Sequence, residues 1–395
     1  FIKVRRDTLM ILLLAFLFHL CNYVEGQNRN NSEINIFATY ISTHGKEPVD
    51  YIMDKFKNHY VVALGEDHWI KDHPLFLCDL IKRINERKDS LNIDVLAIEF
   101  GNVVNQKLAD EFINSTTYRE DLVIKILQSS PDLYGWPYLE VMQIFKTVWE
   151  ENQKKSEEQK TRILILDPPY MIQVMNGETY NYTCSRDESM LNIIRSQLLK
   201  KKRILFYAGL LHTRKTVYGS YLSSDNIYYN QTSAGFLLKS LYPHLVFSIK
   251  LWGGLMGSNG YNKTYEPIKW ERLYNGTIDE AFKINHNKPV GFDIDKSPFS
   301  QIPVTEFYKT SNETLNRSDN RLVGSPYNKS ILLKDDADGI IFFKPVEEFT
   351  GATIYQNFFD DDFIKLINKR TDGKVTNRAD AVEKLKALRP ILETD

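Results

Sequence analysis

The feature that most constrains the fold of this chain is a regular alternation of short apolar runs with amphipathic helical stretches. Strands that are apolar along their whole length are typical of a parallel sheet that is covered on both faces. We therefore expect an α/β fold with a mostly parallel sheet and helices on both faces. The predicted strands are residues 60–64, 95–98, 162–166, 203–208, 245–251, 290–293 and 339–343, and the helices between them include 74–87, 138–150 and 188–200.

Two stretches interrupt this alternation. Residues 102–155 have a helical pattern without a strong strand, so we predict that they form a helical cap over the sheet. Residues 297–333 are polar and rich in Asn-x-Ser/Thr sites, which indicates a long surface loop. Because the chain contains no internal repeat and no low-complexity tract, we expect residues 27–395 to form one domain.

The N-terminus resembles a secretory signal. An apolar run over 9–20 follows three basic residues, and polar sequence resumes at Gln27, so we predict a signal peptide over 1–26. The run is shorter than the roughly 20 residues that span a membrane. An uncleaved anchor or a lipid on Cys21 are the alternatives. We therefore expect a periplasmic, cell-envelope or secreted protein that touches a membrane only through such a segment.

The two cysteines beyond this segment, Cys78 and Cys184, are expected either to form a disulfide or to remain free thiols. Nine Asn-x-Ser/Thr sites are a further hint of export, because an exported chain in a glycosylating host would carry sugars there. An asparagine-rich surface would produce the same pattern without sugars. The sequence leaves both questions open.

Polar side chains stand where four predicted strands end. The first strand runs into Glu66 and His68, the second into Glu99, the third into Asp167, and the fourth into a short turn that carries His212. The carboxyl ends of parallel strands meet at one edge of a sheet, where ligands bind in open α/β folds. Buried carboxylates and imidazoles at such ends must pair with one another. We therefore predict one cleft at this edge.

Three further residues belong to this prediction. Arg186 and Asp187 stand at the start of a predicted helix, and an arginine there can hold a carboxylate or an oxyanion through two hydrogen bonds. Asp187 has the alternative role of an acid that stabilises the first helical turn. His73 lies near the start of its own helix and is expected to act behind His68.

Several motifs, taken in order, resemble the superfamily of ChaN-like haem-uptake proteins and erythromycin esterases. The two Gly-x-x-His motifs with a glutamate between them also resemble the Tiki/TraB metalloprotease branch. The resemblance covers about residues 58–300, and it implies a sheet sandwiched by helices with the motifs in one cleft. The motifs are 65–68 with His73, 97–99, 186–190, 208–215 with Gly219, and 289–293 with 297–299.

The resemblance also implies roles for individual residues. A histidine such as His68 would act as general base on a water molecule, oriented by Glu66 or Glu99. Arg186 would stabilise the negative charge of the tetrahedral intermediate, and His212 would complete the cleft as an acid or a positioning group. Because the chain has no Gly-x-Ser-x-Gly motif, a water is expected to attack rather than a serine.

Three functional hypotheses follow. The first is an exported hydrolase that cleaves an ester or amide of a small molecule or peptide. The second is a metallohydrolase in which His68, Glu99 and His212 hold a divalent ion, as in a Tiki-type protease. The third is a protein that binds haem or iron without catalysis. In that case His73 and Asp187 would help to bind the cofactor. Nucleic acid is not an expected partner, since the net charge is −1 and no block of basic residues occurs.

Overall fold

The computed structural model describes residues 31–87, 91–179, 184–222, 228–256, 270–310, 331–389 and 392–395. The predicted signal segment, 1–26, lies outside these residues. Among the described helices, none combines the length and the apolar character that a membrane crossing requires.

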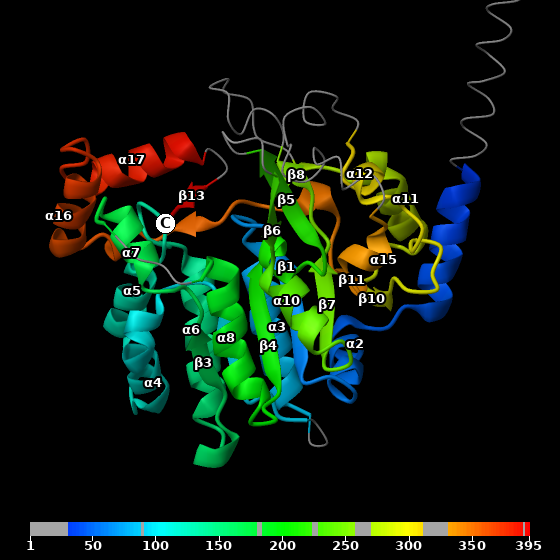
Figure 1. The fold of residues 1–395 in the computed structure, drawn as a ribbon, viewed down its shortest axis with the longest axis horizontal. Helices are drawn as coiled ribbons and strands as arrows, with labels where there is room; N and C mark the ends of the chain where they lie inside the picture. The colour runs from blue at the N-terminus through cyan, green and yellow to red at the C-terminus, as the bar shows by residue number, and fades with distance from the viewer. Residues whose placement is uncertain are drawn as a thin grey trace, which may run out of the picture.

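All seven predicted strands form one sheet, in the spatial order β10-β11-β7-β1-β4-β2-β3 (Figure 1). β1 lies in the middle and pairs in parallel with β4 on one side and β7 on the other, and only the edge strand β10 is antiparallel. The predicted α/β fold with a mostly parallel sheet is confirmed. The strands are β1 Val61–Glu66, β2 Val95–Ile98, β3 Arg162–Ile165, β4 Ile204–Gly209, β7 Val246–Leu251, β10 Val290–Asp293 and β11 Gly339–Phe342.

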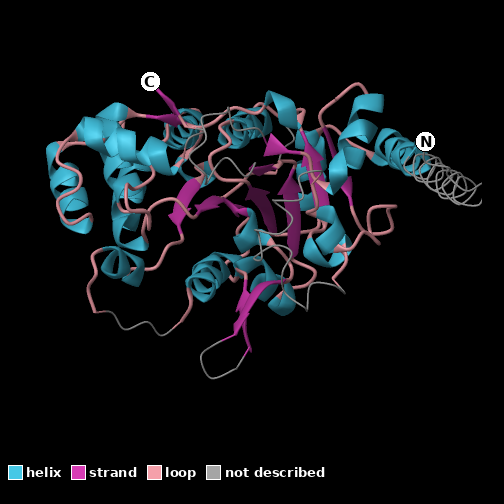
Figure 2. Ribbon diagram, turned by 90° about the horizontal axis from the view of Figure 1, so that it is seen from above, coloured by secondary structure: helices cyan, strands magenta, loops and turns pink. Residues whose placement is uncertain are grey.

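Helices cover both faces of this sheet, and Figure 2 shows the strands lying between them. One face carries α2 (Pro48–Phe56), α3 (Asp72–Asn85) and α6 (Leu139–Asn152), and the other carries α8 (Arg186–Leu198) and α10 (Ala234–Leu241). Side chains alternate along a strand, so both faces of every central strand must be apolar.

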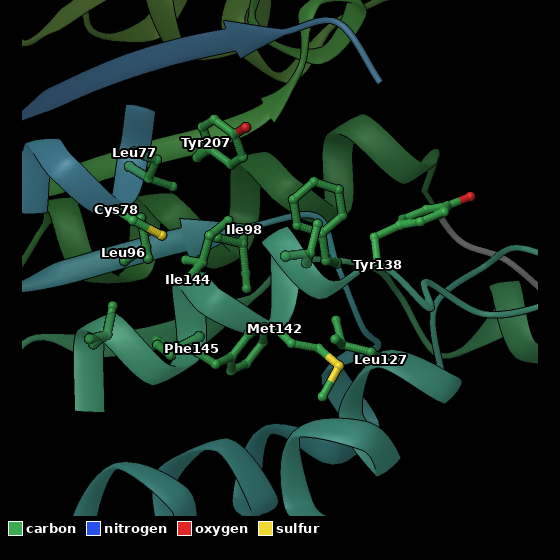
Figure 3. Close-up of a cluster of buried hydrophobic side chains, with 14 of the residues drawn as sticks. Leu77, Cys78, Leu96, Ile98, Leu127, Tyr138, Met142, Ile144, Phe145 and Tyr207 are labelled. Atoms are coloured by element: carbon green, nitrogen blue, oxygen red, sulfur yellow. The ribbon is translucent and has the colours of Figure 1, made fainter. Parts of the chain in front are cut away.

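The side chains of β1 show this alternation. Val62 and Leu64 belong to the core under α3 and α6, whereas Val61 and Ala63 belong to the core under α8 and α10. Figure 3 shows the first of these cores, in which Leu77 of α3 and Phe145 of α6 lie among the residues that pack against the sheet. Because the strands are buried on both faces, their positions in the sheet are fixed, and so are the positions of the residues at their ends.

The helical stretch predicted over 102–155 is present. It consists of α4 (Gln106–Asn114), α5 (Glu120–Gln128) and α6, and α6 packs beside α3 in the layer that covers one face. The loop between α5 and α6 supplies the residues that reach the carboxyl ends of the strands.

The stretch 297–333 differs from its prediction as a surface loop. In its described part, Phe299, Val304 and Phe307 are fully buried in a second core at the β10 end of the sheet. The polar residues around these side chains obscured the apolar pattern, because only Val304 and Phe307 share a helical turn and Phe299 lies before it. Residues 311–330 lie outside the described part of the chain.

The C-terminal segment was not assigned a role from the sequence. Its β12 (Thr353–Ile354) and β13 (Glu393–Thr394) pair with each other, and α16 (Asp361–Arg370) and α17 (Arg378–Leu388) lie between them in sequence. Glu140 at the start of α6 accepts hydrogen bonds from the backbone and the side chain of Thr353, which ties the segment to this helix.

Cys78 and Cys184 are both free thiols, so the disulfide alternative is wrong for this structure. Cys78 is buried on α3, and burial raises the pKa of its thiol to about 11.

Candidate functional site

His68 lies at the carboxyl end of the central strand, between two buried carboxylates. Its Nδ1 is hydrogen-bonded to Glu66, the last residue of β1, and its Nε2 lies 3.4 Å from Oε1 of Glu99. Burial alone would lower the pKa of His68, but Glu66 and Glu99 outweigh it and raise that pKa to about 9. The imidazole is 31% exposed, so one edge of it is open to solvent.

Glu99 connects His68 to the rest of the site. It follows β2 directly, is 3% exposed, and accepts a hydrogen bond of 2.5 Å from the backbone N–H of Gly209. Burial would raise the pKa of Glu99, but the positive charges of His68 and Arg186 lower it, so the side chain is an anion. A Cβ on Gly209 would lie 2.7 Å from the His68 ring and 3.0 Å from the Glu99 carboxylate, which only glycine avoids.

Arg186 is the fixed positive charge of the site. Its guanidinium forms a two-pronged ion pair with Asp167, in which Nη2 donates to Oδ2 at 3.0 Å, and the same Nη2 lies 3.5 Å from Glu99. A capping box between Ser185 and Glu188 fixes the first turn of α8 and thereby the start of this side chain. Burial raises the pKa of Asp167 to about 6 even beside Arg186.

His212 is held in one tautomer. Arg186 can only donate, so the 3.0 Å contact between its Nη1 and Nε2 of His212 makes Nε2 an acceptor. Nδ1 therefore carries the proton and donates to Asp187 at 2.8 Å. Asp187 also accepts from the N–H of Ala234 at 2.7 Å, so its role in this structure is to orient His212.

His73 lies behind the loop that carries His68 and does not line the cavity. It is fully buried, its Nδ1 accepts from the N–H of Asp67 at 2.9 Å, and its Nε2 donates to the carbonyl of Trp252 at 3.1 Å. Burial lowers the pKa of His73, which matches a neutral ring. Both nitrogens are thus bonded to backbone, and His73 fixes the loop that carries His68 rather than facing a ligand.

The described residues contain one group of side chains that could hold a metal ion. Donor atoms of Glu66, His68 and Glu99 all lie within 4.8 Å of one another. His212 was predicted as the third ligand, but its Nε2, although 3.3 Å from Glu99, already accepts from Arg186. The geometry therefore favours Glu66 over His212 in such a site.

A cavity of about 180 Å³ opens beside His68, Glu99 and Arg186. Its other walls include Trp69, next to His68, and residues of the loop between α5 and α6, among them Asp132, Trp136 and Ser130. Sequence reasoning did not find these residues, because none of them ends a strand. The cavity is smaller than the roughly 300–1,000 Å³ of pockets for drug-sized ligands.

The comparisons with known proteins bear on the fold. No protein-family profile and no curated protein matches the chain. Among solved structures, a succinoglycan biosynthesis protein matches with a TM-score of 0.52 at 10% identity, over 80% of this chain and 97% of its own. This likeness shows a shared fold.

Two further matches concern the predicted superfamily. A variant of an erythromycin esterase in its open conformation matches with a TM-score of 0.45 at 11% identity, over 74% of this chain and 92% of its own. The haem-binding ChaN of Campylobacter jejuni matches with a TM-score of 0.34 at 14% identity, over 53% and 87%. The resemblance to the ChaN-like and erythromycin esterase superfamily therefore continues to rest on the sequence motifs, and the likeness to the Tiki/TraB branch stays a prediction.

Proposed function

We propose that this protein is a hydrolase in which His68 activates a water molecule for attack on an ester or amide of a small molecule. The observation that carries the proposal is the position of the His68 imidazole. It stands at the wall of the cavity, its Nδ1 is bonded to the buried Glu66, and its Nε2 is directed toward Glu99. When His68 is neutral, the bond to Glu66 keeps the proton on Nδ1 and leaves the lone pair on Nε2.

The remaining groups fit the steps of hydrolysis. Nε2 of His68 takes a proton from the water as the oxygen attacks the carbonyl carbon, and the imidazolium later returns that proton to the leaving group. Arg186 also lines the cavity and carries a permanent positive charge that would stabilise the oxyanion of the tetrahedral intermediate. Asp167, Glu99 and His212 hold the guanidinium in place.

The test uses a panel of ester, lactone and amide substrates, with the wild-type protein and His68→Gln assayed side by side in the presence of a chelator. The proposal expects turnover by the wild type and a loss of at least a hundredfold in His68→Gln, since a positioned general base contributes about 10²–10⁴-fold. Circular dichroism and a thermal melt show whether the variant is folded. Equal rates for the two folded proteins would rule out the role of His68.

A metal-dependent version of the same function has its own support in the cluster of Glu66, His68 and Glu99. A divalent ion bound there would supply a water of lowered pKa and polarise the substrate carbonyl. Elemental analysis of the purified protein tests this version. The metal-dependent version predicts one bound ion per chain in the wild type and none in Glu66→Gln. It also predicts that a chelator abolishes hydrolysis. A hemin titration in the same experiment tests the haem alternative through the appearance of a Soret band.

We also propose that the protein acts outside the cytoplasm, on the basis of the basic and apolar segment that precedes Gln27. Expression of the full chain followed by N-terminal sequencing of the product tests this. A mature N-terminus at Gln27 in the exported fraction is the expected result, and an intact chain confined to the cytoplasm would contradict it.

A further inference from the structure

Aromatic rings form much of the wall of the cavity beside His68. The centroids of the Trp69 and Trp136 rings lie 5.6 Å and 5.1 Å from that of His68, both edge to face. Phe100 stacks on Trp136 at 5.1 Å and also lines the cavity. A group that enters the cavity to reach His68 therefore packs against indole surface on the way.

The backbone of Trp69 is held in a conformation that a bulky residue rarely adopts. Its φ is +67°, in the left-handed region, which costs about 1–3 kcal/mol for such a residue. The C-terminal segment compensates, because the N–H of Ala352 donates to the carbonyl of Trp69 at 2.8 Å and the Arg389 guanidinium lies 4.3 Å from the indole ring. These contacts fix the indole on the wall of the cavity.

Asp132 supplies a hydrogen-bond acceptor in the wall of the cavity. Asp132 lines the cavity, and its Oδ1 takes the N–H of Tyr134 at 3.0 Å. Burial raises the pKa of Asp132, although Arg389 and Arg370 are close enough to lower it. A carboxylate oxygen at the cavity wall can accept a hydrogen bond from a ligand that carries N–H or O–H donors.

The volume of the cavity and the charges of its wall limit the kind of ligand that can bind there. An apolar cavity of about 150 Å³ accommodates benzene, so about 180 Å³ admits one six-membered ring with its substituents. The charged groups of the wall oppose one another, because Arg186 and His68 stand beside the carboxyl groups of Glu99 and Asp132, so the wall favours neither a cationic nor an anionic ligand. The cavity therefore suits a neutral ring that carries hydrogen-bond donors.

We infer that the substrate is an acylated, hydroxylated six-membered ring, such as a sugar unit that carries an ester or amide. Its C–H face would pack on Trp69 and Trp136, because C–H groups are attracted to the negative face of an indole. One hydroxyl would donate to Asp132, and the acyl carbon would lie beside His68. The binding part of this inference stands on the cavity, and the acyl part rests on the proposed function.

The test measures binding and catalysis separately. Methyl glucoside, cyclohexanol and tetramethylammonium chloride are titrated into the wild-type protein, and binding is followed by tryptophan fluorescence and calorimetry. Methyl glucoside is expected to bind at least tenfold more tightly than either other probe. Tighter binding of tetramethylammonium would overturn the inference in favour of a cationic ligand. Tighter binding of cyclohexanol would overturn the role of Asp132.

Variants locate the binding. Trp69→Asn removes the indole and keeps a residue that tolerates a positive φ, and Asp132→Asn keeps the size of the side chain but removes its charge. Each is expected to weaken methyl glucoside binding at least tenfold. Trp149→Phe is the matched control, because Trp149 donates to the carbonyl of Ser115 and does not line the cavity. Unchanged binding in both cavity variants would overturn the inference.

Acetylated methyl glucosides and phenyl acetate then serve as paired substrates. Faster hydrolysis of the sugar esters, lost in Trp69→Asn, supports the whole inference. Hydrolysis of phenyl acetate without any sugar binding overturns the inference and leaves the proposed function standing. Sugar binding without hydrolysis of any ester overturns the proposed function and the acyl part of the inference, while the sugar site itself stands.

Discussion

The most informative perturbation removes the carboxylates around His68 one at a time. The pKa of this histidine is raised from an ordinary 6.5 to about 9, which corresponds to about 3 kcal/mol in favour of the imidazolium at 1.36 kcal/mol per pH unit. Burial works in the opposite direction, so Glu66 and Glu99 together supply more than this amount. If they share it equally, losing one lowers the pKa of His68 by more than about one pH unit.

Glu66→Gln and Glu99→Gln are therefore each expected to bring the titration of His68 below pH 8. In the double variant burial and the positive charge of Arg186 both act to lower the pKa of His68, which is expected to fall below 6.5. The glutamine side chains keep the size of the originals, so the packing around the ring changes little.

The assay is an NMR titration of protein with isotope-labelled histidine in metal-free buffer. The chain has eight histidines, and comparison with His68→Gln assigns the signal of interest. His73, whose pKa is lowered by burial, serves as an internal control that should not titrate with His68. A wild-type His68 that titrates at or below 6.5 would refute the electrostatic reasoning, as would a Glu66→Gln variant with an unchanged titration.

Further predictions concern stability. The pKa of His68 is higher in the folded state than in the unfolded state, so the stability that His68 contributes is fully present below pH 6.5 and is lost as the pH rises through 9. Urea unfolding of the wild type and His68→Gln should therefore show a larger difference in free energy of unfolding at pH 6 than at pH 10. Asp336→Ala leaves Arg214 buried without its partner and should cost about 3–5 kcal/mol in the same assay, whereas Lys365→Gln, in an exposed pair, should cost nothing measurable. Gly209→Ala places a methyl group against His68 and Glu99 and should lower the free energy of unfolding by about 1–3 kcal/mol; a thermal melt equal to that of the wild type would contradict the close packing there.

The sequence predicted the sheet and the edge at which the polar residues gather, because both depend on local patterns. Seven apolar runs became the seven strands of the sheet, and Glu66, Glu99 and His212 lie near one another since parallel strands end on the same side. The pairing between these residues could not be predicted in the same way. Arg186 forms hydrogen bonds with both Asp167 and His212. These partners depend on where α8 starts relative to the ends of β3 and β4, which no local pattern in the sequence gives.

The residues that line the cavity could not be predicted from sequence patterns either. Trp69 and Asp132 lie 63 positions apart in the numbering and meet only because the loop between α5 and α6 crosses the strand ends. Arg389 reaches Trp69 from the last helix, a contact between residues more than 300 positions apart. His73 had the same residue type and neighbourhood as a ligand histidine, and only its two backbone hydrogen bonds reveal its structural role.

The central claim is that His68 performs hydrolysis in this cavity. The most direct measurement is the rate at which folded wild-type protein and folded His68→Gln hydrolyse an acetylated sugar and a simple aryl acetate in chelator, followed from pH 6 to pH 10. The account predicts a wild-type rate that rises with pH, reaches half of its maximum near pH 9, where half of His68 is neutral, and levels off above that pH, together with a loss of at least a hundredfold in the variant. A wild-type rate no higher than that of buffer, or a rate that survives the substitution, would contradict it.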